Sequence, residues 1–429
     1  MMCAVSFQAS GQTSELTLQE VLEKYNDVSP FVIIKSDITR RSFVYTDRAL
    51  QALDKDKHQY QQRVLIGSNG DEHAAVPVSL LLRDGTSIIA MPSPGARNPY
   101  VVDRIDGKLY ITDQGRVVEE VEYWYKPHYY DQFTSSGKPM WQVASARPQR
   151  LDIDPNSHCH FWSGGNGCKF CNINANSTRS HKERNMEKQL KAQDVYETVK
   201  EALKQPGAFT NLKMSSGSIL SGQEIFDDEV DMYIEMLQAA GDNFKERKFP
   251  STLVASAFNE RQLAKIYENT GLMTYTSDIE IPNEALFAWI CKGKHKEVGY
   301  REWKRRIIAA VDIFGAGNVS SGIVGGCEMA KPHGIKDEDE ALKIVLEEAE
   351  DFASQGVSMV HCVWVPMQGS AFHNQVTPSL EYYVQLAKGL SGIRQKYRLN
   401  IDMDNYRKCG NHPDTDLDRG IGGATFQCH

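Results

Sequence analysis

The stretch that decides the fold is HCHFWSGGNGCKFC, at residues 158–171. Three cysteines, Cys159, Cys168 and Cys171, occur there at the spacing C-x8-C-x2-C, with three glycines between the first two. Glycine lets a backbone bend tightly around a metal site and bring its N–H groups close. Thiolates are the natural ligands of iron–sulfur clusters. Because there are three thiolates rather than four, one iron of such a cluster would stay open for another ligand.

The loop also allows a second kind of metal site. His160 could complete a Cys3His set for zinc, which takes four such ligands. The chain has no second C-x2-C pair of the kind that zinc ribbons carry, so an iron–sulfur site is favoured and zinc stays open as the alternative. His158 and His160 flank the first cysteine. They either tune a cluster by hydrogen bonding or are solvent-exposed loop histidines.

The sequence around this loop alternates short apolar runs with amphipathic helical patterns. Asp194 is expected to cap the first of these helices, with Glu197 completing a capping box, and Asn259 is expected to cap a later one. Six such units predict an α/β fold whose parallel sheet lies open or curls into a partial barrel. Ligands bind at the carboxyl ends of such strands, and the cysteine loop follows the first. The strands are expected at residues 151–153, 211–214, 252–257, 273–281, 318–324 and 359–365.

The first third of the chain has a different pattern, with strand-like runs separated by turn dipeptides. Asp84-Gly85 lies between two apolar runs as a tight hairpin requires, and Asp106-Gly107 and Gln114-Gly115 follow in the same way. We expect a short helix over residues 16–24 and then a small antiparallel domain of about five or six strands. Its first strands are expected at residues 31–34, 76–82 and 87–91.

Composition restricts the class of protein. The 429 residues include 48 basic and 56 acidic ones, for a formal net charge of −8. A dedicated DNA-binding protein needs clustered Lys and Arg, so nucleic acid is not expected as a partner. No run approaches the roughly 20 apolar residues of a membrane span, and the N-terminus lacks the regions of a signal peptide. We therefore expect a cytoplasmic protein whose nine cysteines stay reduced.

The order of these features resembles the radical S-adenosylmethionine (SAM) superfamily. Its members carry three cysteines in the loop after the first strand of a partial (β/α)6 barrel. The usual family spacing is C-x3-C-x2-C, and here the first gap is widened to eight residues. The residue before the last cysteine is commonly aromatic in the family, and here it is Phe170. The resemblance covers about residues 150–400.

Two strand ends resemble places where family members bind SAM. After the second expected strand, Ser215, Ser216 and Gly217 stand where the family has a Gly-Gly-Glu-like turn for the amino group of SAM, but the acid is missing. Only the position of this turn therefore supports the match. Glu280, at the end of the fourth expected strand, corresponds to a polar residue that often contacts the ribose or the methionine moiety of SAM.

The fifth and sixth expected strands add to the resemblance. The family motif Gly-x-Ile-x-Gly-x-x-Glu packs the adenine of SAM, and here Ser321, Ile323, Gly325 and Glu328 occupy its positions, with serine in place of the first glycine. The sixth strand ends in a Pro-x-x-Gly sequence at residues 366–369, and residues 292–314 resemble a helical segment of biotin synthase-like members.

The resemblance implies a [4Fe–4S] cluster held by Cys159, Cys168 and Cys171, with SAM on the open iron. Cleavage of SAM would give a 5′-deoxyadenosyl radical that abstracts hydrogen from a small molecule or biosynthetic intermediate. A low-potential donor such as flavodoxin or ferredoxin would supply the electron. No individual catalytic residue is indicated. Cys291, Cys327 and Cys362 are expected to be core residues, although Cys327 adjoins the expected adenine site.

Several alternatives stay open. The same fold could modify a peptide or protein, or transfer a methyl or an aminocarboxypropyl group. A protein of another class would be a non-radical barrel that binds zinc. The sequence has no Asp-x-His-x-x-Gly signature of a standard cobalamin domain.

Together these patterns divide the chain into three parts. They are a β-rich N-terminal domain over residues 1–145, a partial (β/α)6 barrel of the TIM type over residues 146–402, and a C-terminal tail over residues 403–429. The tail contains Cys409, Cys428 and His412, which could hold an auxiliary metal. A floppy tail with unpaired thiols is the commoner outcome.

Overall fold

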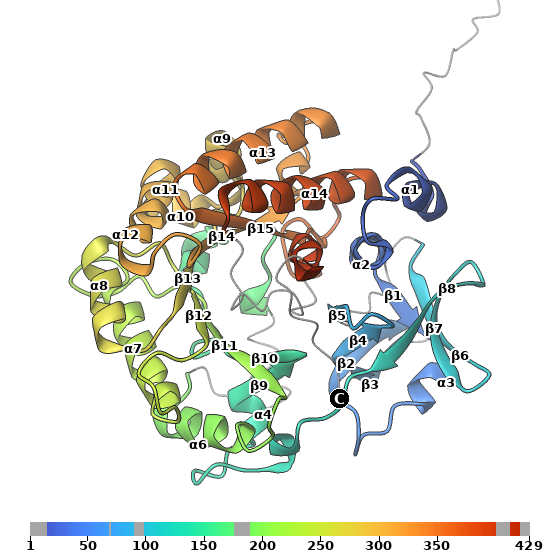
Figure 1. Cartoon of the computed structure of the whole chain (residues 1–429), viewed down its shortest axis with the longest axis horizontal. Helices are drawn as coiled ribbons and strands as arrows, with labels where there is room; N and C mark the ends of the chain where they lie inside the picture. The colour runs from blue at the N-terminus through green and yellow to red at the C-terminus, as the bar shows by residue number, and fades with distance from the viewer. Residues whose placement is uncertain (1–14, 68–69, 90–97, 176–188, 400–411, 421–429) are drawn as a thin grey trace, which may run out of the picture.

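The computed structural model describes residues 15–67, 70–89, 98–175, 189–399 and 412–420. Within them, the backbone forms a seven-stranded sheet, a six-stranded sheet and a two-stranded ribbon (Figure 1). The architecture is mixed α/β, and the seven-stranded sheet curls into a half-barrel with its helices on the outside. No helix of the described residues has both the length and the apolar character needed to cross a bilayer.

The seven-stranded sheet has the order β15-β14-β13-β12-β11-β10-β9. All neighbours from β10 to β15 pair in parallel, and β9 pairs antiparallel with β10 at the edge. The six parallel strands expected from the sequence are therefore present and in chain order. Their bounds, with the edge strand first, are β9 Ala144–Arg147, β10 Gln149–Ile153, β11 Phe209–Ser215, β12 Ser251–Val254, β13 Thr274–Thr276, β14 Val319–Gly325 and β15 Val357–Val363.

The helices that cover the outside of this sheet follow the strands along the chain (Figure 1). They are α6 Ala192–Ala202, α7 Asp227–Gly241, α8 Glu260–Asn269, α9 Glu284–Ile290, α10 Lys292–Glu297, α11 Tyr300–Ala309, α12 Val311–Phe314, α13 Glu338–Ser354 and α14 Leu380–Tyr397. Asn259 caps α8 through a capping box with Gln262, as expected. The helical segment expected over residues 292–314 is divided into α10, α11 and α12.

The two faces of the curled sheet differ in polarity. Leu151, Leu212 and Tyr275 belong to one large apolar core together with buried side chains of the helices, so they face outward. Because side chains alternate along a strand, Asp152 and Lys213 lie on the inner face, where they are direct neighbours in register. The inner face is thus polar, whereas the outer face supplies the core.

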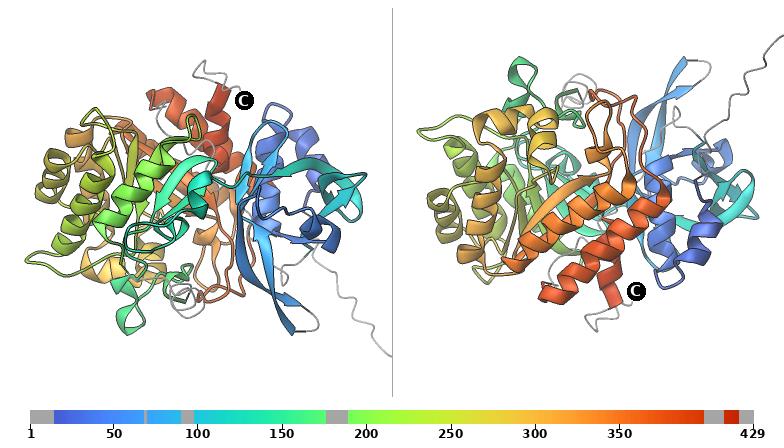
Figure 2. Two further views of the ribbon diagram at one scale, coloured as in Figure 1. Left: turned by 90° about the horizontal axis from the view of Figure 1, so that it is seen from below. Right: turned by 90° about the horizontal axis from the view of Figure 1, so that it is seen from above.

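The six-stranded sheet lies beside the half-barrel (Figure 2). Its order is β1-β6-β7-β8-β4-β5, and the turns at Asp84-Gly85, Asp106-Gly107 and Gln114-Gly115 connect antiparallel neighbours as expected. The sheet is not wholly antiparallel, because β1 pairs in parallel with β6. The strands are β1 Phe43–Tyr45, β4 Ser79–Leu82, β5 Ser87–Ile89, β6 Tyr100–Ile105, β7 Lys108–Asp113 and β8 Arg116–Tyr123; the ribbon pairs β2 Tyr60–Gly67 with β3 Gly70–Pro77.

The strand expected at residues 31–34 is wrong, because this run lies in helix α2 (Pro30–Arg41). Its apolar side chains are buried on two sides. Ile34 packs with the six-stranded sheet, whereas Val32 and Ile33 pack with α1 (Leu18–Lys24) and α14. A helix buried on two sides presents a continuous apolar run, which periodicity alone does not distinguish from a buried strand. Pro30 at the first helical turn is the local signal for the helix.

The capping expected at Asp194 is also wrong. Helix α6 begins at Ala192 with Lys191 as its N-cap, and Asp194 is a buried residue inside the first turn. The hydroxyl of Ser136 donates to Asp194 (2.7 Å), and Glu197 accepts from the N–H and hydroxyl of Ser135. Both carboxylates therefore bind a loop packed against the helix rather than the N–H groups of their own helix.

The described part of the expected C-terminal tail, residues 412–420, is packed against the rest of the protein, contrary to the expectation of a flexible tail. Helix α15 (Pro413–Asp416) and the turn η5 (Leu417–Gly420) bring three aspartates into buried ion pairs. Arg394 pairs with Asp414 (2.7 Å) and Asp418 (2.9 Å), and Lys35 of α2 pairs with Asp416 (2.5 Å). His361 of β15 lies 2.8 Å from the other oxygen of Asp414. Cys409 and Cys428 lie outside the described residues.

We expect Asp414→Ala to destabilise the protein by about 3–5 kcal/mol, because it leaves the Arg394 guanidinium buried without one of its carboxylates. Urea unfolding followed by circular dichroism measures the change. Asp27→Ala is the matched control, since Asp27 pairs with Lys388 on the exposed surface and such pairs contribute little. Equal losses in the two variants would contradict a structural role for the packed segment.

Candidate active site

The cysteine loop leaves the carboxyl end of β10 and is held from two sides. On one side, the N–H of His160 donates to the carbonyl oxygen of Ser218, in the turn after β11 (2.9 Å). On the other side, the N–H of Lys169 donates to the carbonyl oxygen of Ile290, at the end of α9 (3.0 Å). Asn156 joins the loop to the β11 turn, because its side-chain amide donates to the carbonyl oxygens of His158 (2.7 Å) and Gly217 (3.2 Å).

Two glycines allow this close packing. A Cβ atom on Gly217 would lie 2.3 Å from the carbonyl oxygen of His158 and 2.7 Å from the Cα atom of Cys159. A Cβ atom on Gly293, in α10, would lie 2.9 Å from the carbonyl oxygen of Asn166 and 2.9 Å from Cβ of Phe161. Real Cβ atoms do not approach backbone this closely, so both positions require glycine.

The three cysteines of the loop lie within electrostatic reach of one another. Burial raises the pKa of Cys159, and burial together with the charges of the other loop thiols raises the pKa of Cys171 to about 12. Backbone N–H groups oppose this effect. Those of Ser218 and Phe161 lower the pKa of Cys159, and that of Ile173 donates to Sγ of Cys171 (3.4 Å).

This donor set fits an iron–sulfur cluster. One loop carries three half-buried thiols, and backbone N–H groups point at two of the sulfur atoms. This is the usual environment of cluster ligands. No three His, Cys, Asp or Glu side chains of the described ranges lie close enough to share one metal ion. In a four-iron cluster each thiolate binds a separate iron.

A buried ion pair that was not predicted from the sequence lies beside the loop. Lys294 of α10 donates to the Glu280 carboxylate (2.7 Å) and to the carbonyl oxygen of Asp278 (3.1 Å). Its ammonium lies 4.5 Å from the ring centroid of Trp303. The charge of Lys294 lowers the pKa of Cys159, so it favours the thiolate. Nothing in the local sequence distinguishes this lysine from its exposed neighbour Lys292.

Glu280 is held in an unusual conformation four residues after β13, which ends at Thr276 and is shorter than the strand expected over residues 273–281. Its φ of 65° is rare for a residue other than glycine. Its N–H donates to the carbonyl oxygen of Gly322 (3.0 Å), and its own carbonyl oxygen accepts from Val324 (2.9 Å). Burial raises the pKa of Glu280, whereas the charge of Lys294 lowers it. The structure thus brings Glu280 next to the expected strand-five residues, and its charge also acts on Cys171.

A fourth cysteine adjoins the loop. Cys291 is fully buried at the junction of α9 and α10, and both burial and a hydrogen bond with Cys168 raise its pKa. The expectation that Cys291 belongs to the core is confirmed, but its contact with Cys168 was missed. Cys327 is also a buried core residue, and Cys362 donates weakly to the carbonyl oxygen of Ile323 (3.5 Å).

The turn after β11 lacks an acid of its own, but a carboxylate from the next helix reaches it. Glu229 of α7 is fully buried and accepts from the N–H groups of Ile219 (2.9 Å) and Ser256 (3.1 Å). Burial raises the pKa of Glu229 to about 7, against the opposing effect of these donors. Glu229 therefore links the carboxyl ends of β11 and β12. A carboxylate twelve residues after Gly217 carries no recognisable sequence signal.

The expected residues of this turn have different surroundings. The hydroxyl of Ser215 donates to Asp154 on the inner face (2.8 Å), whereas Ser216 hydrogen-bonds the Tyr233 hydroxyl of α7 (2.7 Å). Phe170 is half-buried and packs against the main core. Gly217 touches the backbone of the cysteine loop, as described above. Gly217 is therefore the turn residue that lies directly against the loop.

The expected strand-five residues lie on the outer face. Ile323 is in register with His361, whose ring stacks on Tyr383 of α14. A Cβ atom on Gly325 would lie 2.8 Å from Leu386 of the same helix. The hydroxyl of Ser321 accepts from the N–H of Ile279 (3.0 Å). These contacts leave the backbone at the end of β14, rather than its side chains, to face a ligand.

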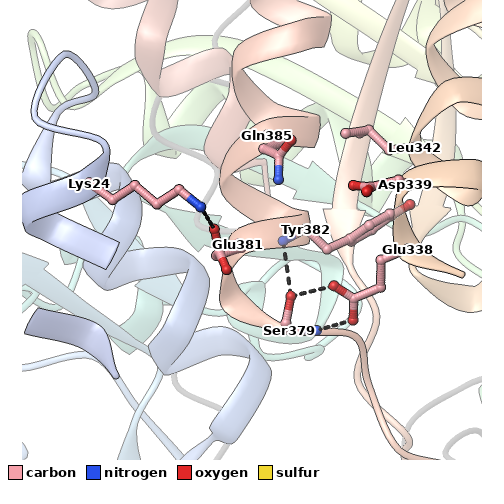
Figure 3. A pocket seen from close by; sticks show the side chains of 8 residues that line it. All are labelled: Lys24, Glu338, Asp339, Leu342, Ser379, Glu381, Tyr382 and Gln385. Atoms are coloured by element: carbon pink, nitrogen blue, oxygen red, sulfur yellow. Dashed lines mark hydrogen bonds and ion pairs between the residues drawn. The ribbon is translucent and has the colours of Figure 1, made fainter. Parts of the chain in front are cut away.

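Glu328, the last residue of the strand-five motif, has structural partners. It accepts from the hydroxyl of Tyr382 and from the N–H of Gly326, and burial raises its pKa to about 7. Tyr382 also lines a shallow pocket between α1, α13 and α14 (Figure 3). This pocket holds a Lys24–Glu381 ion pair and contains no residue of the cysteine loop, so the candidate chemistry lies elsewhere.

Comparisons with known proteins extend these observations. No protein-family model matches the sequence. Over 138 residues, 32% of this chain, the sequence is 26% identical to bacteriochlorophyllide c C-7(1)-hydroxylase from Chlorobaculum limnaeum. The chain spans about a third of that protein, because the match covers 31% of its length.

One solved structure aligns with nearly the whole chain. A solved radical SAM methyltransferase from Sphaerobacter thermophilus aligns over 93% of this chain and 98% of its own, with 15% identity and a TM-score of 0.41. Likeness at that TM-score establishes neither fold nor function. The resemblance to radical SAM enzymes therefore depends on the cysteine loop and its place after the first parallel strand.

We expect Gly217→Ala to loosen the cysteine loop, because the added Cβ overlaps the backbone of His158 and overpacking of this kind costs about 1–3 kcal/mol. Iron retained per chain after anaerobic purification should fall. Gly392→Ala is the control, since a Cβ there meets nothing within 4 Å. Full iron retention in Gly217→Ala would show that the close contact is not needed.

We expect Glu229 to make stability depend on pH. Its pKa is 4.5 when unfolded and about 7 when folded, so the folded state holds a proton that the unfolded state releases. This contribution is fully present below pH 4.5 and is lost as the pH rises through 7. Melting temperatures measured at about pH 5 and about pH 8 should therefore differ less in Glu229→Gln than in the parent protein. The exposed Glu235→Gln on the same helix should leave that difference unchanged.

Proposed function

We propose that the protein is a radical SAM enzyme, with a [4Fe–4S] cluster on Cys159, Cys168 and Cys171 and with SAM as its second cofactor. The observation that carries this proposal is the three-thiol loop at the carboxyl end of β10, packed against the glycine turn after β11. When bound, the cluster supplies the electron that cleaves SAM into methionine and a 5′-deoxyadenosyl radical, which removes hydrogen from the substrate.

The chain's own residues have three tasks in this proposal. The N–H groups of Ser218, Phe161 and Ile173 and the ammonium of Lys294 stabilise the thiolate ligands. Phe161 and Trp303, whose ring centroids lie 6.3 Å apart, pack apolar surface behind the loop and exclude water from it. The turn after β11 and Glu280, after β13, lie at the same edge of the sheet, with β12 between their two strands, and there they can orient SAM.

The domain organisation is part of the same proposal. The curled sheet and its helices, over residues 146–402, would be the partial (β/α)6 barrel that holds both cofactors, with residues 1–145 as a separate N-terminal domain. We propose a low-potential donor such as flavodoxin or ferredoxin as the electron source. The similarity to a bacteriochlorophyllide c hydroxylase supports reaction at a carbon–hydrogen bond of a small molecule over modification of a peptide.

Anaerobic purification with iron and sulfide analysis tests the proposal. We expect about four irons per chain and formation of 5′-deoxyadenosine when dithionite and SAM are added. Cys168→Ala should lose both the iron and the product, because it removes one of three ligands. Cys291→Ala is the matched control: it removes a thiol that contacts Cys168 but lies outside the loop, and it should keep the iron.

Two results would contradict the proposal. Zinc without iron, together with intact SAM, would leave a zinc-binding barrel. Iron retained in Cys168→Ala but lost in Cys291→Ala would move the cluster away from the C-x8-C-x2-C loop.

A further inference from the structure

A group of charged side chains occupies the inner face of the sheet at β9, β10 and β11. Arg150 of β10 lies directly opposite Arg147 of β9, and Asp152 is in register with Lys213 of β11. Leu151 alternates with these residues and faces the outer core. The charged side chains therefore share the concave side of the half-barrel, on the strands whose ends carry the cysteine loop and the glycine turn.

The hydrogen bonds within this group are unevenly distributed. Arg150 binds both oxygens of Asp152, at 2.7 and 3.2 Å. Lys213 and Arg147 each approach Asp152 only to 3.7 Å, which is too long for a hydrogen bond. Over the described ranges neither side chain has a closer acidic partner, and Nε of Arg147 is buried without a hydrogen-bond acceptor.

The neighbouring residues do not supply the missing acceptors. Asp154 accepts from the hydroxyl of Ser215 (2.8 Å). Burial raises the pKa of Asp154, whereas the charge of Lys213 lowers it although the two side chains form no direct ion pair. Farther along the inner face, the Thr274 hydroxyl donates to Thr252 (2.8 Å), and neither residue carries charge. The group thus has three cations, Arg147, Arg150 and Lys213, against two carboxylates, Asp152 and Asp154.

Lys213 and Arg147 are accessible as well as poorly paired. Their side chains are 20% and 23% exposed, whereas Asp152 is 8% exposed. A half-buried ammonium and a half-buried guanidinium on one concave surface form a ready site for an oxyanion, because charge-assisted hydrogen bonds to such groups are strong and arginine matches carboxylate and phosphate geometry. Excess positive charge on a half-buried surface also attracts anions from solution.

We propose that Arg147 and Lys213 bind an oxyanion carried by the substrate, a carboxylate or a phosphate ester. This inference rests on the proposed function, since it names the substrate class of the same site. An anionic group anchored on β9 and β11 leaves the rest of the substrate to extend along the inner face toward the carboxyl ends of the strands. Ser215 and Asp154 lie between the anchor and the cysteine loop and would contact the substrate next.

Titration calorimetry on the purified holoprotein tests the inference, with inorganic phosphate and succinate as probes and sodium chloride matching the ionic strength. We expect at least one probe to bind, and Lys213→Met and Arg147→Met each to weaken its binding by about tenfold to a hundredfold. Lys213→Gln, which keeps a polar side chain, should behave like Lys213→Met. Lys245→Met, at an exposed position after α7, should bind as the parent protein does.

The outcomes separate this inference from the proposed function. Preference for phosphate identifies a phosphate ester, and preference for succinate identifies a carboxylate. Absence of binding in the parent protein, or equal binding in Lys213→Met and Lys245→Met, would overturn the inference. Iron content, measured on the same samples, should stay at the parent level in all variants, and 5′-deoxyadenosine formation should stay at the parent level in Lys245→Met. If the parent protein holds no iron, the proposed function fails whatever the calorimetry shows.

Discussion

The close approach between the turn at Gly217 and the backbone of His158 and Cys159 is the constraint on which the rest of the site depends. Loops that follow adjacent parallel strands emerge at the same edge of a sheet, but side chains normally hold them apart. Here a missing Cβ lets the two backbones touch, which directs the N–H of Ser218 toward the first thiol. Gly293 allows the same contact on the other side. The turn at Gly217 and helix α10 therefore fix the position of the loop before any ligand is bound.

The apolar outer face of the sheet stabilises the fold, whereas the polar inner face carries the candidate binding residues. The outer face and its helices form one continuous apolar core, and this core can fix the strands without help from the inner face. The inner face is thereby free to carry residues that are poor at stabilising a fold, such as Lys213 with its long ion pair. A binding surface can change in such an arrangement while the framework stays intact.

Much of the fold could be predicted from the sequence, because the parallel strands and their helices repeat a simple pattern. The six expected strands are one example, since they lie in chain order in one sheet. Prediction failed where packing departs from that pattern. The run at residues 31–34 is buried on two sides and looked like a strand, and Asp194 binds a loop instead of capping its helix.

The site was predictable only in part. Spacing alone singled out Cys159, Cys168 and Cys171, because metal ligands on one loop leave a local signature. The contacts made by Lys294, Cys291 and Glu229 depend on helices that return to the loop from elsewhere in the chain. No short window of sequence encodes those distances. Ser321 and Ile323 show the reverse, since their motif was recognisable but their side chains turn toward the outer core.

The buried ion pair between Lys35 and Asp416 has a consequence for the order in which parts of the protein fold. Domains generally begin to fold during synthesis, from the N-terminal side. Helix α2 emerges from the ribosome early, yet the carboxylate that neutralises its buried lysine is 381 residues farther along the chain. Until that carboxylate is available, Lys35 must stay hydrated, so α2 cannot settle into its final place. Helix α2, which is made early, is thus among the last elements to be completed.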